Sequence, residues 1–386
     1  MTEAAVAVIR PAALRNNLQR IRSATAGCRI MAVVKANAYG HGLVQIARLL
    51  GEVDALAVAR VSEGVILREV GIRQRIVVLE GCSSAAEMDA AVRHKLDIVV
   101  HDAVHFILLA GVSEEGVLDV WLKVDTGMGR LGFAPADLAD CRAQLLRTPA
   151  VRSSARIMTH LASADDPDNP MTMEQVRRFG EALGFFQGDV SIANSAGLLL
   201  WPQTLESSLT LDYRGDNWVR PGLALYGASP VVGKSAREMG LEPVMSFESR
   251  LISVKTIAAG SGVGYGSNWK ARRDTVVGVA AVGYGDGYPR HLKSGTPVLV
   301  NGRRVALIGS VSMDLISIDL TDVPVANVGD RVVLWGGHLP IEEIAARADT
   351  IPYELMCGLS QRVEHRLESA ESESSAQYSH GVQEES

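Results

Sequence analysis

The stretch Ile30-Met31-Ala32-Val33-Val34-Lys35-Ala36-Asn37-Ala38-Tyr39-Gly40-His41-Gly42 contains an apolar run that leads directly into a lysine and two glycines. β-Branched residues cluster in residues 30–34 and no polar residue interrupts them, which is typical of a buried strand. Helical spacing follows, with apolar residues at Leu43, Ile46, Ala47 and Leu50. The stretch therefore predicts a strand, a turn at the glycines and a helix.

Seven further apolar runs lie within the first 222 residues, and most segments between them carry helical spacing. They are Ala55–Ala59, Ile76–Leu79, Ile98–Val100, Val120–Val124, Arg156–Thr159, Val190–Ala193 and Trp218–Val219. A strand and a helix that alternate in this way predict a (β/α)8 TIM barrel. A doubly wound open sheet is the alternative, but no GxGxxG motif follows the first strand.

The character of the chain changes after Gly222. Alternating apolar runs are separated by Gly, Asn and Asp, and Asn301-Gly302 between two of them is a strong hairpin signal. The runs are Leu251–Ile257, Val276–Val282, Val298–Val300, Val305–Ile308, Leu315–Leu320 and Val332–Trp335. We therefore expect a barrel over residues 1–236 and a mainly antiparallel β domain over residues 237–367. The boundary should fall within 229–243, and the Ser/Glu-rich tail 368–386 is expected to be disordered.

Composition excludes several classes of protein. The 386 residues carry a net charge of −6, which provides no basic field for nucleic acid. No apolar run of membrane-spanning length and no signal peptide is evident, so we expect no membrane partner. The cysteines Cys28, Cys82, Cys141 and Cys357 lack a CxxC spacing, which favours reduced thiols in a cytoplasmic protein without a metal site.

Titratable or hydrogen-bonding residues recur just after the predicted barrel strands. These positions hold Lys35, Arg60, Glu80, His101-Asp102, Asp125 with Arg130, His160, Asn194-Ser195 and Arg220. Barrel enzymes place their catalytic groups at the carboxyl ends of the strands. Any single one of these residues could be a helix cap or a loop residue. Their recurrence at one structural position favours a shared pocket.

A lysine at the exit of a buried strand is costly unless it is compensated. Lys35 is therefore either an amine tuned for Schiff-base chemistry or a side chain that extends to the surface. Arg220-Pro221-Gly222-Leu223 and Asn194-Ser195 could form a phosphate cradle at the last two barrel loops, although Pro-Gly alone usually marks a turn. Together the lysine and the cradle point to pyridoxal phosphate (PLP), which needs an amine and phosphate donors.

Two glycine-rich loops in the second half contain tyrosines, Tyr265 within residues 262–266 and Tyr284 and Tyr288 within residues 282–288. Glycine there permits positive φ or close backbone approach. The alternative is a pair of β-turns with incidental tyrosines, and the loops alone do not decide between the two.

Six ordered blocks of sequence together resemble one family. They are Ala32–Gly42, Lys123–Gly132, Val219–Gly222, Gly264–Gly266, Gly283–Arg290 and Ser312–Asp314. In this order they are similar to the conserved blocks of bacterial alanine racemases, and the resemblance covers roughly residues 4–367, across both predicted domains. It implies a PLP-dependent enzyme that interconverts L-alanine and D-alanine, for peptidoglycan synthesis or for alanine catabolism.

The resemblance also implies roles for single residues. Lys35 would hold the cofactor and act as a base on one face of the substrate Cα, while Tyr265 of the other subunit of a homodimer would be the opposite base. The phosphate of the cofactor would be bound by Tyr39, Ser195, Gly222, Leu223 and Tyr353. Arg220, supported by His160, would hydrogen-bond the pyridine nitrogen. Arg130 and the Met313 backbone would bind the substrate carboxylate. His160, Arg130 and Arg220 are further expected to lower the pKa of the tyrosine base as nearby cations.

Some features of this chain differ from the family pattern or leave alternatives open. Ser310 stands where relatives usually carry arginine, the segment 204–217 looks longer than in relatives, and Lys123 matches a lysine that is carbamylated in some members. A racemase of serine or another small amino acid is an alternative substrate class. A non-catalytic PLP-binding protein is the alternative from another class, although such proteins resemble the barrel alone.

Overall fold

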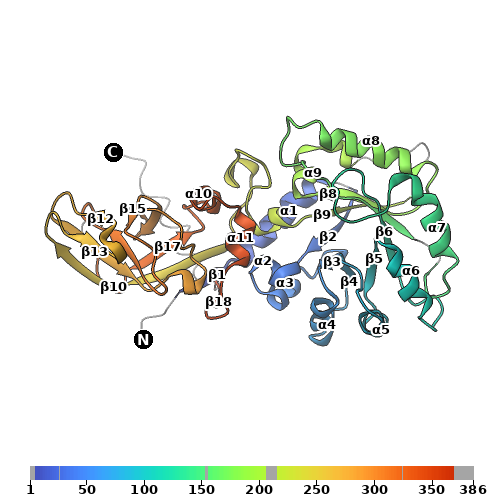
Figure 1. Cartoon of the computed structure of the whole chain (residues 1–386), viewed down its shortest axis with the longest axis horizontal. Coiled ribbons are helices and arrows are strands. Elements are labelled where there is room, and N and C mark those ends of the chain that lie inside the picture. The colour runs from blue at the N-terminus through green and yellow to red at the C-terminus, as the bar shows by residue number, and fades with distance from the viewer. Residues whose placement is uncertain (1–4, 26, 153–154, 206–214, 324, 369–386) are drawn as a thin grey trace. The chain divides into compact units, whose positions relative to one another are not determined.

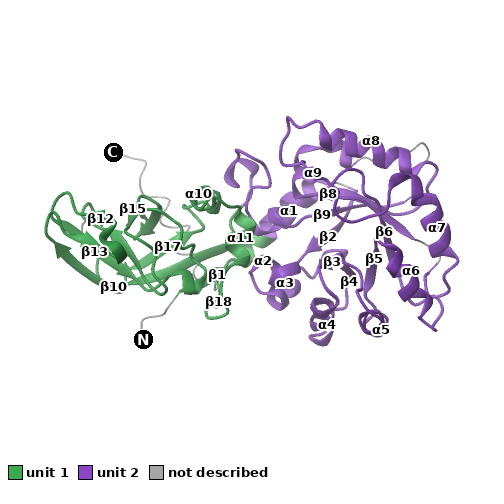
Figure 2. Cartoon of the chain, viewed as in Figure 1, with its two compact units in different colours: residues 1–14, 242–386 green, residues 15–241 purple. Residues whose placement is uncertain are grey.

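The computed structural model describes residues 5–25, 27–152, 155–205, 215–323 and 325–368 (Figure 1). The chain forms two compact units (Figure 2). The barrel unit comprises Arg15–Leu241, and the β unit comprises Glu242–Ser386 together with Met1–Leu14. The division at Leu241 lies inside the segment 229–243 that the sequence suggests, whereas the N-terminal residues differ from the expectation because they belong with the β unit.

The barrel unit is a closed barrel of parallel strands, which confirms the predicted fold class. Its strands, in spatial and chain order, are β2 Arg29–Val33, β3 Ala55–Val58, β4 Arg75–Val78, β5 Asp97–Val100, β6 Val120–Lys123, β7 Arg156–Met158, β8 Val190–Asn194 and β9 Asn217–Arg220. Each one overlaps an apolar run seen in the sequence, because a strand buried on both faces needs apolar residues at nearly every position.

Helices separate successive strands and cover the barrel (Figure 1). They are α1 Pro11–Ala24, α2 Lys35–Tyr39, α3 Leu43–Leu49, α4 Val61–Glu69, α5 Ala85–Arg93, α6 Ala103–Ala110, α7 Leu138–Leu146, α8 Met171–Leu183 and α9 Ser195–Leu200. In α8 the residues Val176, Phe179 and Leu183 are buried, as their spacing of three and four residues requires. None of the helices that the structure describes is long and apolar enough to span a membrane.

The β unit contains one large sheet with the strand order β13-β16-β15-β14-β17-β10-β1-β18, in which β13 also pairs with β10. The strands are β1 Val6–Ile9, β10 Met245–Ile257, β13 Thr275–Ala280, β14 Pro297–Val300, β15 Arg303–Ile308, β16 Ile316–Asp319, β17 Arg331–Trp335 and β18 Glu364–Leu367. Two shorter strands, β11 Gly262–Val263 and β12 Trp269–Lys270, pair with each other, and the helices are α10 Ile341–Arg347 and α11 Pro352–Cys357. All pairs except the parallel pair of β1 and β18 are antiparallel.

Two features of this sheet show what the sequence revealed and what it did not. Asn301 and Gly302 have φ angles of 49° and 77° and join β14 to β15, so the predicted hairpin is confirmed. The first strand, β1, was not expected there. It is only four residues long, and its partners β10 and β18 are remote in sequence, so no local pattern identifies its place.

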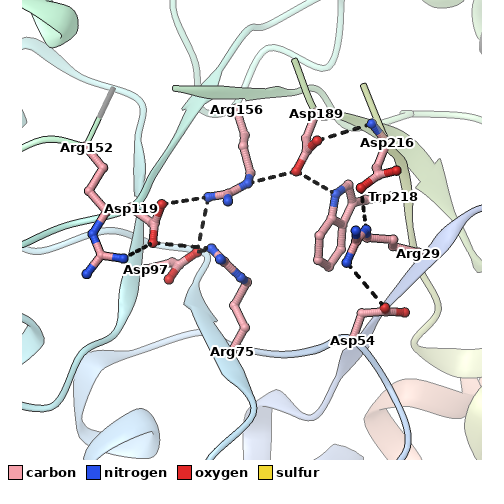
Figure 3. Close-up of polar contacts among 10 residues, drawn as sticks. All are labelled: Arg29, Asp54, Arg75, Asp97, Asp119, Arg152, Arg156, Asp189, Asp216 and Trp218. Carbon is pink, nitrogen blue, oxygen red and sulfur yellow. Dashed lines mark hydrogen bonds and ion pairs between the residues drawn. The ribbon is translucent and has the colours of Figure 1, made fainter. Parts of the chain in front are cut away.

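At the amino ends of the barrel strands, aspartates and arginines from neighbouring strands form a charge network (Figure 3). Its members are Arg29, Asp54, Arg75, Asp97, Asp119, Arg152, Arg156, Asp189 and Asp216. Arg156 on β7 lies at its centre, with nitrogen–oxygen distances of 3.0 Å to Asp189, 3.2 Å to Asp119 and 3.7 Å to Asp97. Its guanidinium also lies 5.8 Å from the ring centroid of Trp121.

Substitution of this central arginine should destabilise the barrel. Because Arg156 is nearly buried, Arg156→Met leaves three carboxylates with less compensation and should lower the free energy of unfolding by about 3–5 kcal/mol at neutral pH. The matched control is Arg152→Met, because Arg152 is exposed and contacts only the edge of the network through Asp119, so its loss should cost about 0–1 kcal/mol. Urea unfolding measures both values, and equal costs for the two variants would contradict the central role of Arg156.

The cost of Arg156→Met should shrink in acid. Burial raises the pKa of Asp97 from 3.8 to about 6, although Arg75 opposes the shift. Since the folded state therefore binds an extra proton between these two pH values, a fall in pH through this window favours the folded state. Below pH 6 the neutral carboxyl of Asp97 no longer needs Arg156, so the difference between wild type and Arg156→Met should be smaller at pH 5 than at pH 7.5.

Candidate active site

The segment that carries Lys35 has an unusual backbone. Strand β2 ends at Val33, and the four residues Ala36–Tyr39 all have φ between 52° and 54°. A left-handed turn made of non-glycine residues costs about 1–2 kcal/mol per residue. The sequence predicts this turn at Gly40 and Gly42, but the chain turns already at the residues that follow Lys35.

Hydrogen bonds from outside the turn hold it in place. The Glu63 carboxylate on α4 accepts from the backbone N–H of Ala36 at 2.8 Å and of Ala59 at 2.8 Å, and Asn37 Oδ1 accepts from the Leu43 N–H at 2.8 Å. Glu63 thus joins the Lys35 segment to the end of β3. Sequence reasoning missed this residue, whose one signal is its place in the first turn of a predicted helix, where a carboxylate often accepts backbone bonds.

Three loops at the carboxyl ends of β2, β8 and β9 form a small cradle of donors. Ser195 Oγ accepts from the backbone N–H of Gly222 at 2.9 Å and of Ala224 at 3.2 Å. Gly222 lies directly against Tyr39, since a Cβ at this position would be 2.4 Å from Tyr39 Oη. Tyr39 in turn stacks on Tyr226 with ring centroids 4.7 Å apart. The cradle therefore combines a phenol, a hydroxyl and backbone N–H groups within one compact site.

Arg220, at the end of β9, is almost completely buried and is held by its neighbours. Its guanidinium donates to the carbonyls of Thr159 at 2.5 Å and Ile192 at 3.3 Å and to the Ser191 hydroxyl, and it lies 3.3 Å from His160 Nδ1. Burial lowers the pKa of Arg220 to about 10, which leaves it charged at neutral pH. Arg220 is thus a fixed cationic donor, and its direction is set by β7 and β8.

The basic groups Lys35, Lys123, Arg130, His160 and Arg220 interact electrostatically with one another. Burial, followed by the charges of Arg220 and Arg130, lowers the pKa of Lys123 to about 8. Burial and the Arg220 charge lower the pKa of His160 well below its usual range, so His160 is neutral at pH 7. The expectation that His160 adds positive charge to the site is therefore wrong, because the ring is buried and its neighbours are already cationic.

The backbone around His160 and the loop that carries Arg130 are also tied together. Gln175 on α8 donates to the His160 carbonyl at 2.9 Å and to Thr126 Oγ1 at 3.2 Å. Asp125 Oδ1 accepts from the N–H groups of Gly127 at 2.9 Å and Met128 at 2.8 Å, which fixes the turn before the exposed Arg130. Gln175 lies in mid-helix in the sequence, where nothing marks it as part of a site.

Tyr265, Met313 and Tyr353 belong to the β unit. Tyr265 lies between Gly264 and Gly266, whose φ angles are 73° and 71°, and its side chain is 72% exposed. The loop at Gly283 packs on the Met313 segment, because a Cβ at Gly283 would lie 2.3 Å from the Met313 carbonyl oxygen. Gly285 N–H donates to the same carbonyl at 2.8 Å. The β unit thus presents exposed Tyr265, Tyr284 and Met313 on adjoining loops.

These features define a barrel enzyme with a lysine and a cationic cluster at the carboxyl ends of its strands, followed by a β unit. Residues 9–230 match the family model "Alanine racemase, N-terminal domain", and residues 244–367 match "Alanine racemase, C-terminal domain". The chain therefore belongs to the alanine racemase family, whose members are isomerases that act on amino acids.

Individual relatives agree with this assignment. The chain is 47% identical to an alanine racemase of Shewanella woodyi, over 91% of this chain and 95% of that protein. It is 46% identical to an alanine racemase of Vibrio cholerae, over 94% of this chain and 98% of that protein. The crystal structure of the biosynthetic alanine racemase of Pseudomonas aeruginosa superposes with a TM-score of 0.87 at 40% identity, covering 95% of this chain and all of that one.

Proposed function

We propose that this protein interconverts L-alanine and D-alanine with PLP held on Lys35, and that Lys35 and Tyr265 are the two bases. The observation that carries the proposal is the convergence of an amine, a fixed arginine and a donor cradle at one end of the barrel. Family membership supports the reaction. Racemisation removes a proton from one face of Cα and returns one to the other face, which requires two bases.

The cradle fits the phosphate of PLP. Ser195 Oγ, the N–H groups near Gly222 and Leu223, and Tyr39 Oη are donors of the type that phosphate oxygens accept, and Tyr353 of α11 is assigned to the same group by the family pattern. Arg220 would donate to the pyridine nitrogen. When bound, PLP supplies an aldehyde for an amine and a ring that delocalises the charge left at Cα.

Replacement of the glycine in the cradle tests this assignment. In Gly222→Ala the new Cβ would overlap Tyr39 Oη, and Tyr39 cannot easily move because it stacks on Tyr226. Such overpacking costs about 1–3 kcal/mol, so PLP affinity should fall about tenfold or more. The matched control is Gly51→Ala, where the nearest atom to the Cβ is at 3.5 Å and affinity should not change. Equal affinity of both variants for PLP would contradict the cradle.

The remaining residues hold the substrate and set the strength of the second base. Arg130 and the Met313 backbone are assigned to the substrate carboxylate. A tyrosine acts as a base only as its phenolate, whose negative charge nearby cations stabilise. Arg130 and Arg220 are the cations available for this, whereas His160 is neutral and instead accepts at Nδ1 from Arg220.

A homodimer would complete the site. The loops with Tyr265, Tyr284 and Met313 expose large apolar surface, and side chains of this kind are covered in subunit interfaces. We infer a two-fold dimer in which Tyr265 of the partner subunit faces Lys35. None of the four cysteines forms a disulfide, which supports a reducing, cytoplasmic location, where D-alanine would serve cell-wall synthesis or alanine catabolism.

Chiral analysis of products from a panel of L-amino acids tests the function. L-Alanine should yield D-alanine until the two enantiomers are equal, and kcat/KM for L-serine should be lower. A higher kcat/KM for L-serine would show that the protein is a serine racemase. A protein that binds PLP but forms no D-amino acid from any substrate would be a non-catalytic PLP carrier and would overturn the proposal.

Lys123 should also be carbamylated. Because its pKa is about 8, a good share of its amine is neutral at pH 8 and can attack carbon dioxide. A nitrogen–carbon bond then forms, the nitrogen releases a proton to water, and the resulting anion is stabilised by Arg130 and Arg220. Carbon-13 NMR in labelled bicarbonate should show a protein carbamate signal that weakens below pH 7, where the amine is protonated. A signal that persists unchanged in Lys123→Met would contradict this assignment.

A further inference from the structure

A second concave site lies at the amino ends of the barrel strands, at the end opposite to Lys35. The loops that join α4 to β4 and α5 to β5 line a cavity of about 490 Å³. Its lining residues are Arg68, Gly71, Ile72, Arg73, Arg93, His94 and Lys95, and no acidic residue is among them. We call this cavity the basic pocket.

Arg68 holds the two loops of the basic pocket together. Its guanidinium donates to the backbone carbonyls of Ile72 at 2.8 Å, Gln74 at 2.6 Å, His94 at 2.9 Å and Lys95 at 3.0 Å. Each loop therefore receives hydrogen bonds from the same side chain. The hydrogen-bond acceptors of Arg68 are neutral backbone carbonyls and not carboxylates. Its positive charge is therefore not neutralised by a contacting group and adds to the positive potential of the pocket. A pocket held in this way needs little ordering when it binds a ligand.

The exposed cations of the basic pocket differ from the arginines of the charge network at this end of the barrel. Arg29, Arg75, Arg152 and Arg156 all contact aspartates of the charge network. Within the described part of the chain, no carboxylate lies within 4.0 Å of Arg73, Arg93 or Lys95. Arg93 lies in the last turn of α5 and Lys95 directly follows its C-cap His94, where the helix dipole favours a cation, whereas Arg73 lies in the loop after α4.

Lys95 also has an unusual backbone conformation at the end of α5. Helices α4 and α5 end in the same motif, in which the residue with positive φ donates to a carbonyl of the last turn and the next residue donates to the carbonyl one residue earlier. These bonds are Gly71 to Arg68 and Ile72 to Leu67 in α4, and Lys95 to Val92 and Leu96 to Ala91 in α5. The position usually takes glycine, as it does at Gly71 with φ 87°. Lys95 occupies this position with φ 51°, a left-handed conformation that is unfavourable for any residue with a side chain.

We propose that the basic pocket binds a small anion that carries two or more phosphate groups. Guanidinium groups pair with phosphate oxygens through two hydrogen bonds, and a lysine ammonium adds a point charge. The cavity volume falls in the range of small-molecule sites. The net charge of the chain is −6, so the protein as a whole does not attract anions. An anion would be attracted by the local positive charge of this pocket. A small ligand fits better than duplex nucleic acid because the cations line a hollow rather than a long stripe.

Titration of the PLP-loaded protein with tripolyphosphate tests the proposal, since loading keeps the probe out of the phosphate cradle. Calorimetry should show saturable binding of one tripolyphosphate per chain, weakened by salt, with orthophosphate at least tenfold weaker. The double variant Arg73→Glu/Lys95→Glu should lose affinity at least tenfold. The control Arg48→Glu, an exposed arginine in the last turn of α3 and outside the pocket, should retain it.

A second variant separates a binding role of Lys95 from a role in stability. Lys95→Gly removes a side chain from a positive-φ position, so the melting temperature should rise while tripolyphosphate affinity falls severalfold. Racemase activity should be unchanged in every variant of the pocket, because none of its residues belongs to the proposed active site. The proposal is overturned if the wild type shows no saturable binding, or if the double variant binds as tightly as the wild type.

Discussion

Lys35→Ala should reduce racemisation of alanine by about 10⁴-fold or more, because the substitution removes the proposed base and the amine proposed to hold the cofactor. The purified variant should also lose the visible absorption that PLP shows when it is bound to a lysine. The barrel itself should remain folded. Lys35 follows β2 and does not pack in the barrel wall, and the strained turn is held by Glu63 and Asn37.

The matched control is Lys234→Ala, an exposed loop lysine in the same unit, which should keep both the absorption and the activity. Adding methylamine to Lys35→Ala distinguishes a lost base from a lost fold. A small amine that enters the vacated space should restore part of the rate, whereas an unfolded barrel cannot be rescued. A Lys35→Ala variant with normal absorption and normal kcat/KM would sink the assignment of Lys35.

The barrel could be predicted from the sequence because its strands are buried on both faces. A strand such as Ile30–Val34 must be apolar throughout, so it stands out even without its partners. The residues after each strand could be predicted as a group for the same topological reason. The topology predicts one end of the barrel for Lys35, Arg130, His160, Ser195 and Arg220. Electrostatic interactions and hydrogen bonds join these residues or their immediate neighbours there.

Other parts of the site could not be read from local sequence. Alanine has no preference for positive φ, so the left-handed turn at Ala36–Tyr39 exists only because Glu63 and neighbouring backbone groups hold it. The neutral state of His160 depends on its burial and on the cations around it, and both are properties of the assembled site. The charge network was not predicted, because its aspartates and arginines lie near the starts of the strands, whereas catalytic groups of a barrel are expected at the ends of the strands.

The segments at the margins of the chain illustrate another limit. The short strand β1 joins the sheet of the β unit, although it precedes the whole barrel in sequence. Its position in the sheet is determined only by pairing with β10 and β18. Four residues are too few to show an alternating pattern from which this pairing could be predicted. The expected disordered tail falls outside the described residues except for Glu368, and so does most of the segment 204–217 that looks longer than in relatives.

Mixing two inactive variants should restore activity if each site is shared between subunits. Lys35→Ala and Tyr265→Ala should each be nearly inactive alone, with losses of at least about 10²-fold. In a mixed dimer, one site carries both substitutions, and the other combines an intact Lys35 with an intact Tyr265 of the partner subunit. Random pairing of equal amounts gives mixed dimers in half of the molecules, so about a quarter of the wild-type activity should return.

The double variant Lys35→Ala/Tyr265→Ala supplies the reciprocal control when it is mixed with an equal amount of wild-type protein. In the shared-site arrangement every mixed dimer has one fault in each site, so only wild-type homodimers work and about a quarter of the activity of an all wild-type sample remains. If each chain instead used its own Tyr265, every wild-type chain would stay active and about half would remain. A value of one half, together with no recovery in the first mixture, would show that Lys35 and Tyr265 act within one chain. The two mixtures must agree, because both report which chain supplies the second base.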